Sequence, residues 1–372
     1  MSNTRAPYRY DIVGSFLRKQ ELKQARAQYA AGVITAEVLK EVEDRCIRSL
    51  VEGEKAVGLK AVTDGEYRRA FWHLDFLWNL LGVEKVEVEH FSIAFQGHQP
   101  KSQTLKIVDQ IDFPADHPFL NHFHFLKELA GDAAAKQCIP SPSMLHLICC
   151  VREEHYEPIA RYKDEDVLLN DIALAYQKAI RAFYDEGCRY LQLDDTSWGE
   201  FCSAEKRAAY AARGIDLDTV AKKYVRMINK ALEAKPADMT ITMHICRGNF
   251  RSTWFTSGGY EPVAETLFGG CNVDGFFLEY DSERAGGFEP LRFIKNQKVV
   301  LGLITSKNPK LEDKAAVIAR IHEAEQYVPL EQLSVSPQCG FASTEEGNLL
   351  TEEEQWAKLA LVKEIAEEVW GK

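Results

Sequence analysis

The stretch Ile241–Phe250, with the sequence ITMHICRGNF, is the one around which the chain is organised. It predicts a short buried strand followed by a turn. Side chains two apart on a strand point the same way, so His244 and Cys246 present a nitrogen and a sulfur to one point. Such a pair is half of a soft divalent metal site, with zinc the first expectation. A hydrogen-bonded histidine beside a buried thiol gives the same pattern, so the other ligands must come from elsewhere.

The runs on either side of this stretch alternate between strand-like and helical character. Those that predict strands begin near residues 10, 61, 137, 190, 240, 275, 299 and 332. Those that predict helices cover residues 19–31, 36–58, 123–135, 166–187, 217–234, 261–268, 311–327 and 352–369. Strand–helix alternation implies parallel pairing through crossovers, and eight such units are the count of a closed barrel.

We therefore expect an α/β fold, a single (β/α)8 TIM barrel that forms one catalytic domain over residues 1–372. The alternative is a doubly wound open sheet, but no Gly-x-Gly-x-x-Gly motif follows the first strand. Residues 83–113 alternate between apolar and polar side chains, which is typical of half-exposed strands. This region predicts a β-hairpin inserted after the second strand.

Composition limits the class of protein. The chain has 372 residues, of which 46% are hydrophobic and 27% charged, so it is ordinary globular material with ample length for a large core. A formal charge of −11 argues against a nucleic acid or an anionic membrane as partner. The first ten residues contain no apolar run, and no segment reaches the ~18 apolar residues of a membrane span. We expect a cytoplasmic protein whose nine cysteines are reduced and available as metal ligands.

Polar residues collect where the expected strands end, which is where barrel enzymes carry their active sites. The set comprises Ser15, Glu66, Asp194, Asp195, His244, Cys246, Glu279 and Cys339. Each also has an ordinary structural interpretation. Asp194 and Asp195 suit a helix N-cap, for example, and Glu279 suits an ion pair with an arginine such as Arg284. All of them lie at the carboxyl end of an expected strand, which favours a shared site, because unrelated polar residues would be found at both ends of the barrel.

The metal set is completed by two residues from other strand ends. Cys339 follows the last strand, and Gly340 after it permits a close backbone approach to an ion. With His244, Cys246 and Glu279 it makes a set of two sulfurs, one nitrogen and one carboxylate, which is the ligand chemistry of four-coordinate zinc. The carboxylate is the most replaceable of the four.

With these residues the chain resembles the catalytic C-terminal half of the cobalamin-independent methionine synthases. The matching segments are Ile12–Phe16, Asp64–Glu66, Leu191–Asp195, the His244-x-Cys246 pair, Glu279 and Cys339-Gly340. The resemblance covers essentially the whole chain and is greatest to the short stand-alone bacterial members, in which Cys-Arg-Gly-Asn-Phe follows the histidine. It implies a zinc-dependent S-methyltransferase that moves a methyl group to the thiol of homocysteine to give methionine.

The resemblance also implies roles for individual residues. His244, Cys246, Glu279 and Cys339 would hold the zinc ion. Glu66 and Asp194 would hold the ammonium of homocysteine and Ser15 its carboxylate, which agrees with the charges involved. Glu279 and Asp194 would be the catalytic pair. Trp198, Trp254 and Phe255 are flat enough to stack on a methyl donor, but large aromatics in loops more often serve packing, so they are left out of the expected site.

Two departures from the full-length synthases bear on the methyl donor. A chain of 372 residues has no room for the second, N-terminal half that helps to hold the folate. The motif at the end of the fourth expected strand reads Asp-Glu-Pro in those enzymes, whereas here it reads Asp194-Asp195-Thr196-Ser197-Trp198. The candidate donors are a methylated folate such as methyltetrahydrofolate, methylcobalamin on a partner protein, or another methylated metabolite.

The sequence is also compatible with three other functions. The first is a zinc thiol-alkyltransferase with another acceptor such as coenzyme M, although Glu66 and Asp194 would then face a sulfonate. The second is a metal-free decarboxylase on a related barrel. The third is a structural zinc site in a binding module.

Overall fold

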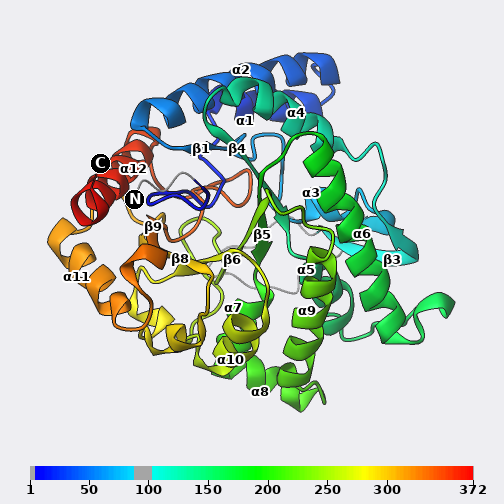
Figure 1. The fold of residues 1–372 in the computed structure, drawn as a ribbon. Helices are drawn as coiled ribbons and strands as arrows, with labels where there is room; N and C mark the ends of the chain where they lie inside the picture. The colour runs from blue at the N-terminus through cyan, green and yellow to red at the C-terminus, as the bar shows by residue number, and fades with distance from the viewer. Residues whose placement is uncertain (1–4, 88–102, 372) are drawn as a thin grey trace.

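A parallel sheet of seven strands forms the centre of the protein, in a computed structural model that describes residues 5–87 and 103–371. The strands curl around the middle of the view in Figure 1, and helices surround them. Their order is β1-β4-β5-β6-β7-β8-β9, so each crossover joins neighbouring strands. The bounds are β1 Ala61–Val62, β4 Ala134–Pro140, β5 Tyr190–Asp195, β6 Thr240–Ile245, β7 Gly275–Glu279, β8 Lys298–Ile304 and β9 Leu333–Pro337.

The register of the central strands brings the predicted site residues to one edge of the sheet. Asp194 on β5 is paired with His244 on β6, and His244 is paired in turn with Phe277 on β7. Every residue of β5, β6 and β7 is buried. Because parallel strands all point the same way, their carboxyl ends meet at the same edge.

The expected first strand does not join the sheet as a strand. Tyr10 makes one isolated parallel bridge to Val335 of β9. The Asp11 carboxylate accepts the N–H groups of Tyr8 and Ile12, so these donors are not available to a neighbouring strand. The same segment then approaches β1, where Thr63 Oγ1 donates to the Gly14 carbonyl. The prediction of an α/β fold with a parallel sheet is confirmed. The prediction of eight strands in a closed barrel is not: among the described residues the parallel sheet has seven strands, and the segment around Tyr10 contacts both of its edge strands.

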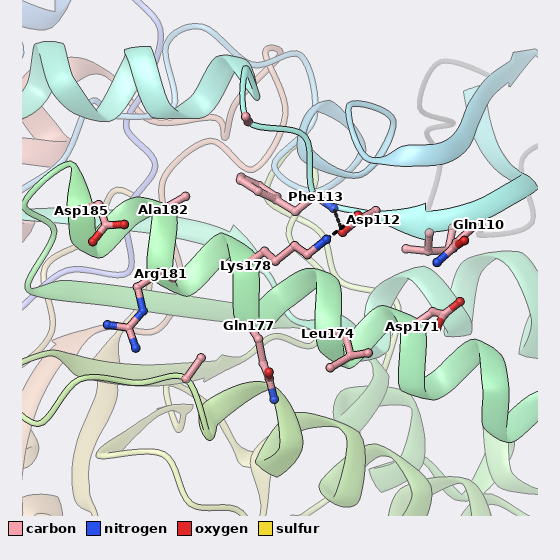
Figure 2. A pocket seen from close by; sticks show the side chains of 13 residues that line it. Gln110, Asp112, Phe113, Asp171, Leu174, Gln177, Lys178, Arg181, Ala182 and Asp185 are labelled. Atoms are coloured by element: carbon pink, nitrogen blue, oxygen red, sulfur yellow. Dashed lines mark hydrogen bonds and ion pairs between the residues drawn. The ribbon is translucent and has the colours of Figure 1, made fainter.

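The inserted hairpin is confirmed. β2 (Leu81–Glu87) and β3 (Gln103–Asp112) pair antiparallel after β1, and the part of the predicted hairpin between them lies outside the described residues. Its inward side chains, among them Leu105 and Ile107, are buried in the main core. Between β3 and the helix α6 (Glu165–Asp185) lies an open pocket of about 600 Å³ (Figure 2). Its lining includes none of the predicted site residues.

The long helices match their predicted positions, with one shift. They are α1 Gln20–Ala30, α2 Ala36–Val57, α4 Pro118–Ala130, α6, α9 Leu217–Leu232, α10 Glu261–Gly270, α11 Lys314–Glu325 and α12 Glu352–Trp370. α4 was expected over residues 123–135 but begins and ends earlier, because the His117 side chain caps its start, Pro118 occupies its first turn, and Gly131 follows its last residue. None of the described helices is long and apolar enough to cross a membrane.

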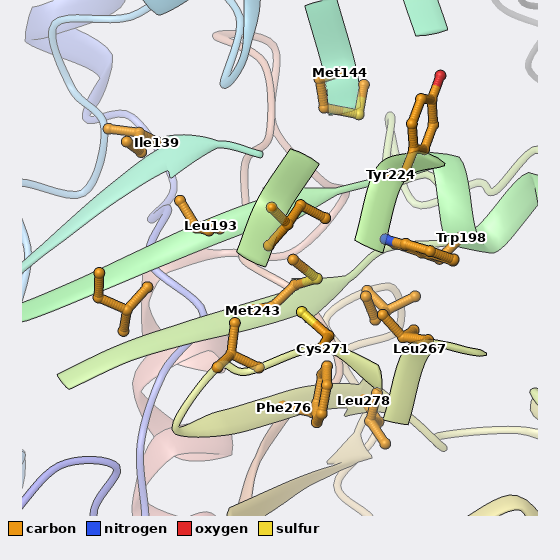
Figure 3. Close-up of a cluster of buried hydrophobic side chains, with 14 of the residues drawn as sticks. Ile139, Met144, Leu193, Trp198, Tyr224, Met243, Leu267, Cys271, Phe276 and Leu278 are labelled. Carbon is orange, nitrogen blue, oxygen red and sulfur yellow. The ribbon is translucent and has the colours of Figure 1, made fainter. Parts of the chain in front are cut away.

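Several short helices were not predicted. They are α3 Leu74–Leu77, α5 Pro142–His146 with the π-helical turn Leu147–Val151, α7 Ser197–Cys202 and α8 Ala204–Ala212. α7 begins directly after β5 and carries Trp198, which is fully buried among the core side chains in Figure 3. Trp198 therefore serves packing, as the sequence favoured.

Candidate functional site

The four predicted metal ligands converge on one point. A nitrogen of His244, the sulfurs of Cys246 and Cys339 and a carboxylate oxygen of Glu279 all lie within 4.8 Å of one another, and all four residues are buried. His244 comes from β6, Glu279 from the last position of β7, and the two cysteines from the loops that follow β6 and β9. Nε2 of His244 is buried and has no hydrogen-bond partner among the described residues, while Nδ1 lies 3.3 Å from the Phe277 carbonyl oxygen.

The two thiols form an unequal pair. Their sulfurs are 3.7 Å apart. The hydrogen bond from Cys246, together with the positive charge of His244, holds the pKa of Cys339 well below its ordinary value in spite of burial. The same hydrogen bond, with burial, raises the pKa of Cys246. The pair thus stabilises one thiolate, the form of sulfur that binds metals.

Glu279 is held from two sides. Its Oε1 accepts the backbone N–H of Arg247 at 3.0 Å, and its Oε2 lies 2.9 Å from Nη2 of Arg284. Burial alone would raise the pKa of Glu279, but the charges of Arg284, Lys307 and His244 outweigh it, so the pKa lies below its usual range. The ion pair that the sequence suggested for Glu279 therefore exists, and the carboxylate faces the other three ligand atoms at the same time.

A network of amide groups holds the loops that carry the cysteines. Asn249, three residues after Cys246, donates to the Gly340 carbonyl at 2.7 Å. Asn348 donates to Asn249 Oδ1 at 2.9 Å and to the Ser306 carbonyl at 2.8 Å. The loop after β6 is thereby fixed to the loop after β9, although the two cysteines are 93 residues apart in the chain.

Three of the four donor residues, His244, Cys246 and Cys339, line a small cavity. It has a volume of about 20 Å³, which is room for about one water molecule. Its lining includes six of the predicted site residues: Ser15, Glu66, Asp194, His244, Cys246 and Cys339. Gly340 lies against Ser15 so closely that a Cβ atom on it would sit 1.9 Å from Ser15 Oγ. This contact explains why a glycine follows Cys339.

Glu66 adopts a backbone conformation that is rare for a residue with a side chain. Its φ is +61°, in the left-handed region, where strain is usually tied to a functional constraint. Its carbonyl accepts from Arg18 Nη2 at 2.8 Å, and its carboxylate lies 3.4 Å from Arg69 Nη1. Burial raises the pKa of Glu66 to about 8, although Arg69 opposes the shift, and Oε2 has no hydrogen-bond partner among the described residues.

The two adjacent aspartates have different surroundings. Asp194 faces the cavity, and burial raises its pKa to about 6 although His244 and a 2.7 Å hydrogen bond from Gln192 oppose the shift. Asp195 instead accepts the N–H of Ser197 at 2.7 Å, in the first turn of α7. Thr196 is the N-cap residue of α7 and makes no side-chain cap, so Asp195 binds the first N–H group of the helix from just outside it, whereas Asp194 lines the cavity.

Several residues near the site were not predicted. Trp72 and Ser343 line the cavity from loops, where nothing in the local sequence distinguishes them. Cys138 lies with Glu66 and Asp194 in a second group of buried donor atoms. It precedes the end of β4, so the rule that placed the other site residues at strand ends would have found it.

The fold and this donor set define a class: an α/β protein with a parallel sheet whose carboxyl edge carries a buried cluster of metal-type ligands beside a cavity. The family model of the cobalamin-independent synthase catalytic domain matches residues 11–368. The chain therefore belongs to the family of cobalamin-independent methionine synthases.

Similar proteins span the same length. The uncharacterized protein YxjG of Bacillus subtilis (strain 168) is 50% identical over 372 residues, which is 100% of this chain and 97% of that protein. A crystal structure from Listeria monocytogenes, which carries the provisional name of a vitamin-B12 independent methionine synthase, is 47% identical with a TM-score of 0.80 and covers 100% of both chains. A B12-independent methionine synthase from Shewanella sp. W3-18-1, solved in complex with selenomethionine, shares the fold at 18% identity, with a TM-score of 0.71 and 97% of both chains covered.

Proposed function

We propose that this chain transfers a methyl group to the thiol of homocysteine and gives methionine, using a zinc ion held by His244, Cys246, Glu279 and Cys339. The observation that carries the proposal is the contact between two features. Four metal-type donor atoms lie within 4.8 Å of one another, and the residues of three of them line a cavity that Ser15, Glu66 and Asp194 also line. A sulfur site beside carboxylates suits an amino acid that carries a thiol.

The residues present fit zinc. Two sulfurs, an imidazole and a carboxylate are ordinary zinc ligands, and the unpaired Nε2 of buried His244 needs a partner. When bound, zinc would supply the positive charge that keeps a coordinated thiol ionised at neutral pH. The resemblance to the cobalamin-independent methionine synthases implies the same four ligands for zinc.

The chain's own residues would bind and orient the amino acid. Glu66 and Asp194 are buried carboxylates that would pair with the ammonium, and the Ser15 hydroxyl, which lines the same cavity, would donate to the carboxylate of the substrate. Glu279 would be the ligand that the substrate sulfur replaces, because a carboxylate holds zinc less firmly than thiolates do. A cavity with room for about one water has to widen to admit homocysteine.

Several finer assignments belong to the same proposal. The first candidate for the donor is a methylated folate such as methyltetrahydrofolate. We also propose that residues 1–372 work as a single catalytic domain in the cytoplasm, in keeping with nine cysteines that are all free. Another thiol as acceptor would leave Glu66 and Asp194 without an ammonium to bind.

The test is to count the sulfur ligands of the zinc-loaded protein by X-ray absorption. We expect two sulfurs at about 2.3 Å without homocysteine and three with it, at the expense of a light atom. Cys246→Ser and Cys339→Ser should lose most of the zinc, since a hydroxyl is a poor substitute for a thiolate. Cys150→Ser is the matched control, because Cys150 is a free cysteine outside the donor set and should keep its zinc.

Two results would reject the proposal. Full zinc content in both Cys246→Ser and Cys339→Ser would show that the ligands are wrong. A sulfur count that stays at two while homocysteine binds would show that the thiol does not reach the metal.

A further inference from the structure

Arg284 contacts the metal-type cluster only through Glu279. It belongs to the short 3-10 helix Glu283–Ala285 that follows β7, and its side chain is only 8% exposed. Nη2 lies 2.9 Å from Glu279 Oε2 and 2.8 Å from Asp281 Oδ1. One buried guanidinium nitrogen therefore serves two buried carboxylates.

The position of Arg284 is fixed from the outer side as well. Its guanidinium lies 4.9 Å from the centre of the Trp254 ring, in the loop after β6. Its carbonyl accepts the N–H of Gly258 from the same loop at 2.9 Å. These contacts hold the guanidinium beside Glu279, and it stays charged because arginine does not deprotonate in proteins.

Glu279 therefore has a partner that does not depend on the metal. Oε1 accepts the Arg247 N–H and Oε2 accepts Arg284, so each oxygen shares its electron density with a protein donor. Such a carboxylate is a weaker donor to a metal than a free one. It also keeps an ion pair whenever it gives up its place, which matters because an unpaired buried charge is strongly unfavourable.

We infer that Arg284 is a positioning residue that makes Glu279 the exchangeable member of the four ligands. It weakens the hold of this carboxylate on the metal and pairs with it after the substrate thiol has taken its place. The inference rests on the proposed function and adds to it the residue that selects which ligand leaves. The two thiolates and His244 have no comparable ion pair among the described residues.

The test uses the full-length protein with Co²⁺ in place of zinc, whose visible spectrum reports thiolate coordination. Arg284→Met removes the charge and keeps most of the volume. We expect it to bind homocysteine about tenfold to a hundredfold more weakly than the wild type, the range set by one charge-assisted contact. Co²⁺ itself should be held as tightly as in the wild type or more tightly. Arg292→Met is the matched control, since Arg292 pairs with Glu261 at an exposed position and should change neither affinity.

The decisive comparison places Arg284→Met in a Glu279→Gln background. If Arg284 acts through the charge of Glu279, the substitution should have no further effect on homocysteine affinity there, which is the non-additivity of a directly coupled pair. Arg284→Lys keeps a charge and should recover most of the lost affinity, and it also covers the case in which the methionine variant fails to fold.

The failure of the proposed function and the failure of the role of Arg284 give different results. A wild-type spectrum that does not respond to homocysteine rejects the proposed function itself. A wild-type response with unchanged affinity in Arg284→Met overturns only the role of Arg284. The same holds if Arg284→Met weakens binding equally in the Glu279→Gln background, or if Arg284→Lys binds as weakly as a chain with no charge at this position.

Discussion

Glu66 and Asp194 sit in an environment that opposes their charge. Both are buried, and burial raises the pKa of Glu66 to about 8 and that of Asp194 to about 6. The charge of Asp194 also raises the pKa of Glu66, because two nearby negative charges repel each other. An arriving ammonium would relieve that repulsion and offer a partner to the unpaired Oε2 of Glu66. This is the environment that the proposed ammonium site requires.

The first prediction at this scale is a pH dependence of amino-acid binding. Norleucine carries the ammonium and carboxylate of homocysteine without the thiol. Glu66 is neutral below its pKa of about 8 and must lose a proton to pair with the ammonium. Norleucine affinity should therefore rise about tenfold per pH unit toward pH 8 and level off above it. Calorimetric titration at several pH values measures this.

Glu66→Gln supplies the control for that titration. Its amide does not ionise, so the rise between pH 6 and pH 8 should disappear and the affinity should stay low throughout. A flat profile in the wild type, or the same slope in Glu66→Gln, would show that Glu66 does not bind the ammonium.

The sequence predicted which strand-end residues come together, but not the loop residues and ion pairs that surround them. Side chains at strand ends could be placed because parallel strands bring their ends together, and the cavity unites six of them. Trp72 and Ser343 reach the same cavity from loops whose course depends on tertiary contacts, which no local pattern encodes. The pairing of Arg284 with Glu279 was suggested by sequence proximity, but only the structure shows that it coexists with the donor cluster.

At the scale of elements, the site depends on two loops that follow β6 and β9. Asn249 ties one to the other through the Gly340 carbonyl, and Gly340 packs directly on Ser15. The helices and strands that support these loops were predicted well because their hydrophobic patterns are long. The shift of α4 shows the limit, since its bounds were set by the cap at His117 and by Gly131 rather than by its apolar residues.

The prediction for these elements concerns Gly340→Ala. A Cβ atom there would lie 1.9 Å from Ser15 Oγ, so Ser15 or the Cys339 loop must move. Overpacking of this kind typically costs about 1–3 kcal/mol, and here it should also weaken both zinc and norleucine binding. Urea unfolding and ligand titration measure the two effects.

Gly269→Ala is the matched control, because a Cβ atom on Gly269 in α10 would meet nothing within 4 Å. It should leave ligand binding unchanged. If Gly340→Ala binds zinc and norleucine as tightly as this control, the close packing of Gly340 on Ser15 does not shape the site.

Across the whole molecule, the seven-stranded sheet is joined at its edges by the segment around Tyr10 rather than by a full eighth strand. We predicted this segment as one of eight strands because its apolar residues are typical of a strand. The Asp11 side chain, however, accepts N–H groups that would otherwise bond to a neighbouring strand. The arrangement leaves Gly14 and Ser15 free to turn toward β1 and the cavity. The sequence could not reveal this, because the competition between side chain and neighbouring strand is settled only in the folded chain.

The last prediction is that zinc stabilises the whole fold. Its four ligands belong to β6, β7 and the loops after β6 and β9, so the ion would join parts of the chain that are far apart in sequence. A ligand that binds only the folded state at 100 times its Kd stabilises that state by about 2.7 kcal/mol. With an unfolding entropy of about 2 cal/mol/K per residue, a chain of 372 residues should gain about 4 °C in Tm. Differential scanning calorimetry with and without zinc measures the shift.

The shift in Tm should vanish in Cys246→Ser and Cys339→Ser and persist in Cys150→Ser. An equal shift in all three variants would mean that zinc stabilises the protein from some other site, and the four-ligand assignment would then fall even if the enzyme binds zinc.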